Sequence, residues 1–167
     1  MAVYRLLQNR ILSELEELDR AQAAVQRHWR AIVHGVTDQD AYLDSVALNL
    51  HGFYSGLERT FEAIAVQIDG GNLADGGCDA ELLRQMTLDL PGVRPAVLRR
   101  RSAEQLDELR SFRHLVRNIY TANLAPRRMQ PLVELLPDLW IEVRGQLEAF
   151  AAYLDTLSHA DEGNAAN

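Results

Sequence analysis

The sequence predicts an all-α protein, an up-and-down bundle of four to five helices with three long amphipathic helices. Through most of the 167 residues, apolar side chains recur at spacings of three and four, the period of an amphipathic helix. No segment keeps the period-two alternation or the β-branched run that is typical of a strand. An apolar content of 47% suffices for one core. We therefore expect a single domain over residues 1–158, followed by a disordered tail over residues 159–167.

The first two helices show the most regular patterns. An apolar stripe over residues 3–32 predicts the first helix, which should end near Gly35. Thr37 or Asp38 is suited to be the N-cap of the second helix. Its near-heptad stripe covers residues 43–68 and stops at a pair of glycines, a common helix end.

The second half of the chain is more divided. The segment ELLRQMTLDL (81–90) predicts a short helix, ended by Pro91 and Gly92. A further helical pattern continues to about Tyr120, and a long stripe over residues 132–157 predicts the last helix. Short links between such helices favour an up-and-down bundle.

Charge is unevenly distributed along the chain, whose formal net charge is −7. Between Arg94 and Arg128 there are nine arginines and only three acidic residues, so this segment has a net charge of +6. Such a segment can present a local positive field to an anionic partner. The alternative is that these arginines pair with acidic residues on neighbouring helices. The single cysteine, Cys78, excludes an intrachain disulfide.

Several common chemistries lack their motifs in this sequence. We find no P-loop, no G-x-G-x-x-G, no G-x-S-x-G, no H-E-x-x-H and no E-x-x-H pair of the di-iron bundle type. The five histidines are scattered. We therefore expect neither a metal nor a cofactor. No apolar run approaches the roughly 20 residues that span a bilayer, so a cytoplasmic location without membrane attachment is the expectation.

The segment FRHLVRNIY (112–120) has the highest density of side chains that can bind phosphate or transfer a proton. On a helical wheel its polar residues and Arg110 share one sector beside an apolar seam. Guanidinium groups bind phosphate bidentately, and an imidazole exchanges protons near neutral pH. A base that takes the 2′-OH proton and an arginine that stabilises the phosphate would cleave RNA without a metal. One copy of the face offers a single histidine, and a two-fold dimer would supply both an acid and a base.

Four stretches together resemble the HepT-like ribonuclease toxins of the HEPN superfamily. They are LHGFYSGLERTFEAIA (50–65), LLRQMTLDLPGVRPAVL (82–98), ELRSFRHLVRNIY (108–120) and PLVELLPDLWIEVRGQLEAFAAYL (131–154). The resemblance covers most of the chain and implies a dimeric helical bundle that cleaves RNA. It also implies a two-gene toxin–antitoxin pair, in which a minimal nucleotidyltransferase of the MntA type neutralises the toxin by adenylylating a motif tyrosine.

The family motif, R-N-x-x-x-H-x-Y, can be placed on this chain residue by residue. Arg113 matches the arginine, His114 the polar residue after it, Asn118 the histidine position and Tyr120 the tyrosine. Asparagine cannot act as a general base near neutral pH. We therefore expect Arg113, His114 and Asn118 to form the catalytic set, with His114 as the acid or base.

The remaining expectations concern binding. Arg110 and Arg117 are the expected contacts to RNA phosphate, and Tyr120 is the expected site of modification by the antitoxin. Three alternatives stay open. The chain would be a non-catalytic binding module, a nucleotide-binding HEPN domain, or a protein whose arginines pair with acids such as Glu58 and Glu62 on the second helix.

Overall fold

The computed structural model describes residues 2–71, 79–118 and 126–165. Every element in these residues is a helix: α1 (Ala2–Val33), α2 (Gln39–Gln67), α3 (Asp79–Met86), α4 (Arg100–Asn118) and α5 (Pro126–Ala165). Within the described part of the chain, β pairing is confined to one isolated bridge between Leu90 and Arg94. The prediction of an all-α bundle is confirmed.

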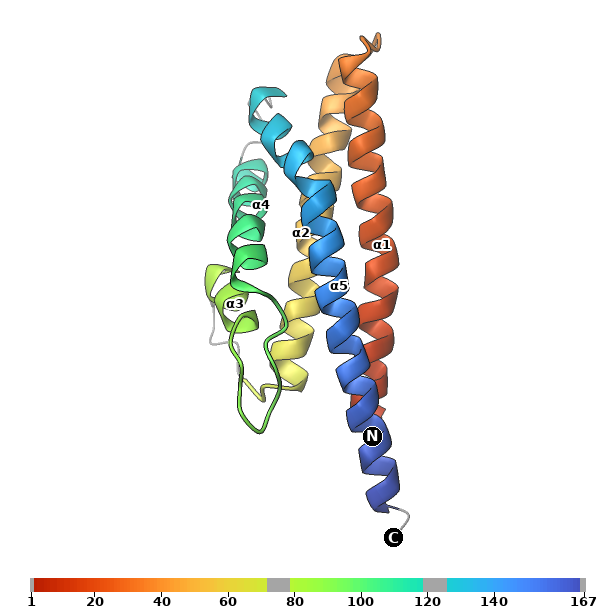
Figure 1. Cartoon of the computed structure of the whole chain (residues 1–167). Helices are drawn as coiled ribbons and strands as arrows, with labels where there is room; N and C mark the ends of the chain where they lie inside the picture. The colour runs from red at the N-terminus through yellow and green to blue at the C-terminus, as the bar shows by residue number, and fades with distance from the viewer. Residues whose placement is uncertain (1, 72–78, 119–125, 166–167) are drawn as a thin grey trace.

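Four of the helices run alternately up and down (Figure 1). The long helices α1, α2 and α5 have 32, 29 and 40 residues and form the main body, in which α1 packs on both α2 and α5. The shorter α3 and α4 lie together on one side and pack against α2 (Figure 1). The three long amphipathic helices are therefore those expected from the periodicity.

The core is built from the apolar stripes of these helices. The fully buried side chains with the largest volumes come mainly from α2, with others from α1, from α3, from α4 and from the segment before α4: Tyr54, Phe53, Phe61, Leu7, Ile11, Leu18, Leu50, Leu57, Ile64, Met86, Leu98 and Leu106. Val3, at the start of the predicted stripe, is instead 49% exposed because it lies in the first turn, at the end of the bundle.

Asp38, one of the two expected residues, is the N-cap of α2, although its side chain makes no capping hydrogen bond. Two other helix boundaries differ from the expectations. The short helix α3 ends at Met86, four residues earlier than expected, because the Met86 carbonyl oxygen accepts from the N–H groups of Val97 and Leu98 and the Leu90 N–H donates to the Arg94 carbonyl oxygen. In the opposite direction, α5 continues through residues 159–165, most of the expected tail, and ends at Ala165.

The connection between α3 and α4 is fixed by one buried arginine. Arg94 pairs with Asp69, just beyond the end of α2, through Nε–Oδ1 and Nη2–Oδ2 contacts of 2.5 and 2.8 Å. Its remaining N–H groups donate to the carbonyl oxygens of Gln85, Leu88 and Pro95. All five guanidinium N–H groups thus have an acceptor. This arrangement, called the Arg94 clamp below, sets where α4 begins.

The single cysteine, Cys78, lies outside the described residues. None of the helices in the described ranges combines the length and the apolarity that a membrane span requires.

Candidate functional site

The motif region lies on α4, whose packing determines where each side chain points. Leu106, Leu109 and Phe112 are buried and hold α4 against the rest of the bundle. Arg113 follows Phe112 directly and therefore lies at the edge of this packed face, whereas His114 is turned a further 100° toward solvent.

Arg113 is held by two carboxylates from two other helices. Its Nη1 donates to Glu58 Oε2, and its Nη2 donates to Glu58 Oε1 at 2.9 Å, so that Glu58 on α2 binds it in a bidentate manner. Nη2 also donates to Oδ2 of Asp79, the first residue of α3, at 2.7 Å. The guanidinium carbon lies 5.4 Å from the ring centroid of Tyr54, also on α2. We call these four residues the Arg113 cluster.

The Arg113 cluster is only partly enclosed. The side chains of Arg113 and Glu58 are 11% and 13% exposed, whereas that of Asp79 is 35% exposed. The contact with Tyr54 is a cation–π interaction, which is strongest where water is partly excluded. Glu58 is thus the enclosed partner of Arg113, and Asp79 is the partner at the solvent side.

Ionisation in the cluster reflects an excess of negative charge. Burial raises the pKa of Glu58, and Asp79 and Glu62 raise it further, so the opposing effect of Arg113 does not bring it down to its ordinary value. Burial alone would lower the pKa of Arg113, but Glu58 and Asp79 outweigh this and raise it. Burial also raises the pKa of Tyr54, which keeps its hydroxyl neutral.

His114 and Arg110 occupy different surroundings from Arg113. The imidazole of His114 is exposed to solvent. Arg110, one turn earlier, is half-buried and its Nε donates to Asp107 Oδ1 at 2.6 Å. Within the expected polar sector, Arg113 is therefore at the border with the packed face and His114 is on the solvent side.

The other expected site residues lie at the end of α4. The helix ends at Asn118, so the backbones of Arg117 and Asn118 are helical. Their side chains, and the whole of Tyr120, lie outside the described residues. The prediction of a phosphate contact at Arg117 and of a modified Tyr120 therefore stays a prediction.

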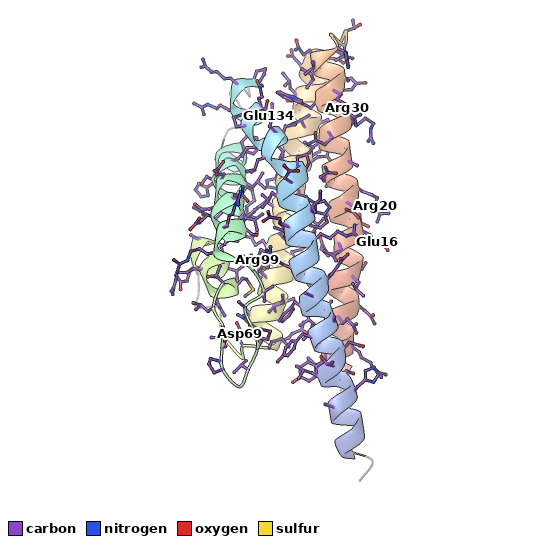
Figure 2. All side chains as sticks on the ribbon, in the orientation of Figure 1. Glu16, Arg20, Arg30, Asp69, Arg99 and Glu134 are labelled. Carbon is purple, nitrogen blue, oxygen red and sulfur yellow. The ribbon has the colours of Figure 1, made fainter. Side chains whose placement is uncertain are left out.

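The basic segment from Arg94 to Arg128 divides into paired and exposed arginines. Arg94 is fully buried against Asp69, and Arg113 is enclosed by Glu58 and Asp79, so both follow the alternative of pairing with acids of neighbouring elements. The side chains of Arg99, Arg100, Arg101, Arg127 and Arg128 are exposed. In Figure 2, Arg99 lies beside α5 and apart from Asp69 at the foot of α2.

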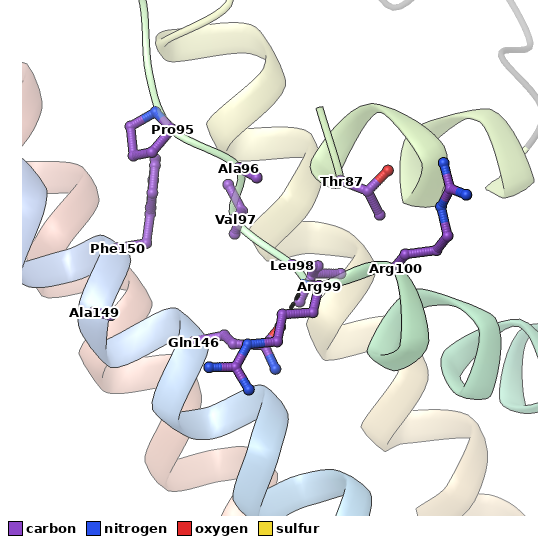
Figure 3. Close-up of a pocket in the computed structure, with 10 residues that line it drawn as sticks. All are labelled: Thr87, Pro95, Ala96, Val97, Leu98, Arg99, Arg100, Gln146, Ala149 and Phe150. Carbon is purple, nitrogen blue, oxygen red and sulfur yellow. Dashed lines mark hydrogen bonds between the residues drawn. The ribbon is translucent and has the colours of Figure 1, made fainter. Parts of the chain in front are cut away.

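A cavity of about 550 Å³ lies where the segment before α4 faces α5. Pro95, Val97, Leu98 and Phe150 are among its apolar lining residues. The Arg99 backbone N–H donates to Gln146 Oε1 at 2.7 Å, which ties the two walls together. Figure 3 shows the Arg99 side chain extending across α5, whereas the Arg100 side chain extends toward α3. None of the expected catalytic residues lines this cavity.

Sequence reasoning did not identify Tyr54 and Asp79 as partners of Arg113. Tyr54 and Glu58 are one helical turn apart on α2, a spacing that places both on one face and was available as a signal. Asp79 had no such signal, because its approach to α4 depends on how α3 folds back. In the described part of the chain, no three His, Cys, Asp or Glu side chains are grouped so as to hold a metal ion.

Comparison with known proteins gives one result. A family model described as HepT-like protein matches residues 45–154, which include most of α2, all of α3 and α4, and the greater part of α5. No curated protein and no solved structure matches the chain. Because the family match covers about two thirds of the sequence and the fold agrees with it, the chain belongs to the HepT-like protein family of the HEPN superfamily, which is associated with toxin–antitoxin pairs.

Proposed function

We propose that this protein is the toxin of a HepT-like pair, a metal-independent endoribonuclease that acts on RNA as a homodimer. The observation that carries the proposal is the exposed imidazole of His114 directly beside the motif arginine, Arg113, on the helix of a HepT-like protein. Arg110 lies one turn before His114 on the same helix. A proton-transfer group and two guanidinium groups are thus brought within a few residues of each other.

The reaction uses these groups in defined roles. His114 of one protomer takes the 2′-OH proton, and the 2′-oxygen forms a bond to phosphorus while the bond from phosphorus to the 5′-oxygen breaks. The leaving 5′-oxygen receives a proton from a second imidazole. A homodimer that joins two copies of this face supplies that second group. A guanidinium stabilises the charge that develops on the phosphate oxygens.

The partner follows from the family association. A minimal nucleotidyltransferase of the MntA type would neutralise the toxin by adenylylating Tyr120, which stands two residues after the end of α4. An adenylyl group adds bulk and negative charge beside the motif, and both oppose the approach of RNA.

The test is cleavage by the purified protein after enzymatic removal of any nucleotide adduct, in the presence of a metal chelator. Transfer RNA, messenger RNA and short single-stranded RNA are offered as substrates. We expect cleavage by the wild type and at least about a hundredfold loss in His114→Ala, the usual contribution of an acid–base group. His34→Ala is the matched control, because His34 is also exposed and lies just beyond α1. Intact RNA in every wild-type reaction would refute the proposed function.

A second candidate function is a non-catalytic HEPN module that binds RNA, a nucleotide or the nucleotidyltransferase. Two observations favour it: Asn118 stands at the histidine position of the motif, and Arg113 is already bound by two carboxylates. Binding of RNA or ATP without cleavage, together with normal growth of cells that express the chain, would support this candidate over the ribonuclease.

A further inference from the structure

The Arg113 cluster contains one more negative group than positive groups. One guanidinium faces two carboxylates, Glu58 and Asp79, so the ionised cluster has a net charge of −1. A phosphate that approaches Arg113 in this state meets an excess of negative charge. The motif arginine therefore lacks the positive field that RNA binding requires, unless one carboxylate leaves or is neutralised.

The two carboxylates are not equivalent. Glu58 binds Arg113 through both of its oxygens, comes from the middle of α2 and is 13% exposed. Asp79 binds through one recorded contact, stands at the first residue of α3 and is 35% exposed. Displacing Asp79 breaks one hydrogen bond and moves a carboxylate into water. Displacing Glu58 would break two bonds inside the bundle.

From this difference we propose that Glu58 is the positioning residue that fixes the Arg113 guanidinium, and that Asp79 occupies the anion position where a phosphodiester of the bound RNA replaces it. The inference rests on the proposed function for the identity of the anion. The Nη2 group that donates to Asp79 lies at the solvent side of the cluster, and a phosphate oxygen accepts the same hydrogen bond. The ring of Tyr54 remains against the guanidinium, with its centroid 5.4 Å from the guanidinium carbon.

The consequence is a competition between α3 and RNA for one cation. With Asp79 in place, α3 is docked on α4 and Arg113 is masked. With RNA in place, Arg113 binds phosphate and the first turn of α3 loses an anchor to α4. The other contacts of α3 do not depend on Asp79: Leu82, Leu83 and Met86 are buried in the core, and Gln85 is bonded to Asp69 and Arg94 of the clamp.

The test measures binding of a fluorescent 2′-O-methyl RNA, which has no nucleophile and cannot be cleaved by 2′-OH attack. Asp79→Asn should bind at least about fivefold more tightly than the wild type, the lower range of a coupling between two competing contacts. Removal of the phosphate contact itself, in Arg113→Ala, should flatten the log–log salt dependence by about 0.7, the value for one phosphate contact on a single strand. Glu58→Gln should bind more weakly than the wild type, because Arg113 then loses its charged anchor.

The matched control is Glu81→Gln. Glu81 lies on the same helix, pairs with Arg84 three residues later and is exposed, so this variant makes the same change of charge and also removes the partner of an arginine. Equal gains in Asp79→Asn and Glu81→Gln would overturn the proposal, because they would report a general charge effect. A gain in Asp79→Asn that persists with Arg113→Ala would also overturn it.

A second measurement does not depend on the variants. Hydrogen exchange at the hydrogen-bonded amides of α3, from Leu83 to Met86, should become at least about threefold faster when the wild type binds the RNA, because local opening follows the loss of an anchoring contact. Unchanged or slower exchange in the RNA complex would overturn the proposal. Cleavage of unmodified RNA is assayed separately, so loss of the ribonuclease function and failure of the Asp79 displacement give different results.

Discussion

Two arginine clusters join α2 to the segments that follow it, and they differ in how completely the cation is enclosed. In the Arg94 clamp, one arginine meets one carboxylate and three carbonyl oxygens, and the two charged side chains are 0% and 4% exposed. In the Arg113 cluster, one arginine meets two carboxylates, one of which is 35% exposed. The Arg94 clamp has no net charge and an acceptor for every guanidinium N–H group, as expected of a structural ion pair. The Arg113 cluster has a net negative charge and one carboxylate that is accessible to solvent, as expected of a site where one anion can replace another.

The Arg94→Ala variant should have the largest effect on stability. It leaves Asp69 buried without its cation, which costs roughly 3–5 kcal/mol of unfolding free energy for a buried pair. Chemical denaturation measures this loss. Replacement of both residues, as in Arg94→Met with Asp69→Leu, should restore part of it because no unpaired charge remains. A loss below about 1 kcal/mol in Arg94→Ala would show that the clamp is no more important than a surface ion pair.

The Arg113→Ala variant should have a smaller effect on stability and a larger effect on RNA. Glu58 and Asp79 then face each other without a cation, but both retain some access to water, so we expect a loss of about 1–3 kcal/mol. Binding of 2′-O-methyl RNA should fall more than in Arg94→Ala, once both variants are compared at a temperature where each is folded. The reverse order for RNA binding would contradict the distinction between a structural clamp and a binding cluster.

The pH dependence of the unfolding free energy tests whether Glu58 titrates with a raised pKa. Burial raises the pKa of Glu58 above its ordinary value of 4.5, with Asp79 and Glu62 adding to the effect and Arg113 opposing it. In the range between the unfolded and the folded pKa, the folded protein binds more protons than the unfolded chain. The contribution of Glu58 to stability is therefore fully present below pH 4.5 and is lost as the pH rises through the folded value.

The Glu58→Gln variant removes this titration. The difference in unfolding free energy between wild type and Glu58→Gln should change across that window, with the variant gaining relative stability as the pH rises. Glu16→Gln, an exposed residue of α1 that does not contribute to the pKa shift of Glu58, is the control and should follow the wild type. Parallel curves for wild type and Glu58→Gln would mean that Glu58 does not titrate with a raised pKa.

The sequence predicted the fold more completely than the site, for physical reasons. Helix periodicity is a local property, so the stripes of α1, α2 and α5 could be identified without knowledge of their partners. The pairing of Arg113 with Glu58 was only one open alternative, because a helical wheel places residues on a face but not against a neighbour. The contribution of Asp79 depends on the folding back of α3, and the saturation of Arg94 depends on three carbonyl oxygens, one near the end of α3 and two in the segment after it. Neither leaves a periodic signal.

The smallest effect should come from Tyr54→Phe. The phenyl ring still lies beneath the Arg113 guanidinium, where the tyrosine ring centroid is now 5.4 Å from the guanidinium carbon, so the cation–π contact persists. Burial raises the pKa of the hydroxyl, so the variant removes no charge in the neutral range. We expect a stability change of roughly 0.5–1.5 kcal/mol, the value of one hydrogen-bonding group, and unchanged affinity for 2′-O-methyl RNA. Tyr42→Phe, whose ring packs edge-on against His28 of α1, is the control on the same helix. An affinity loss in Tyr54→Phe as large as that in Arg113→Ala would transfer the phosphate-binding role from the guanidinium to the hydroxyl, and the cluster would then hold Arg113 only as a structural ion pair, as the clamp holds Arg94.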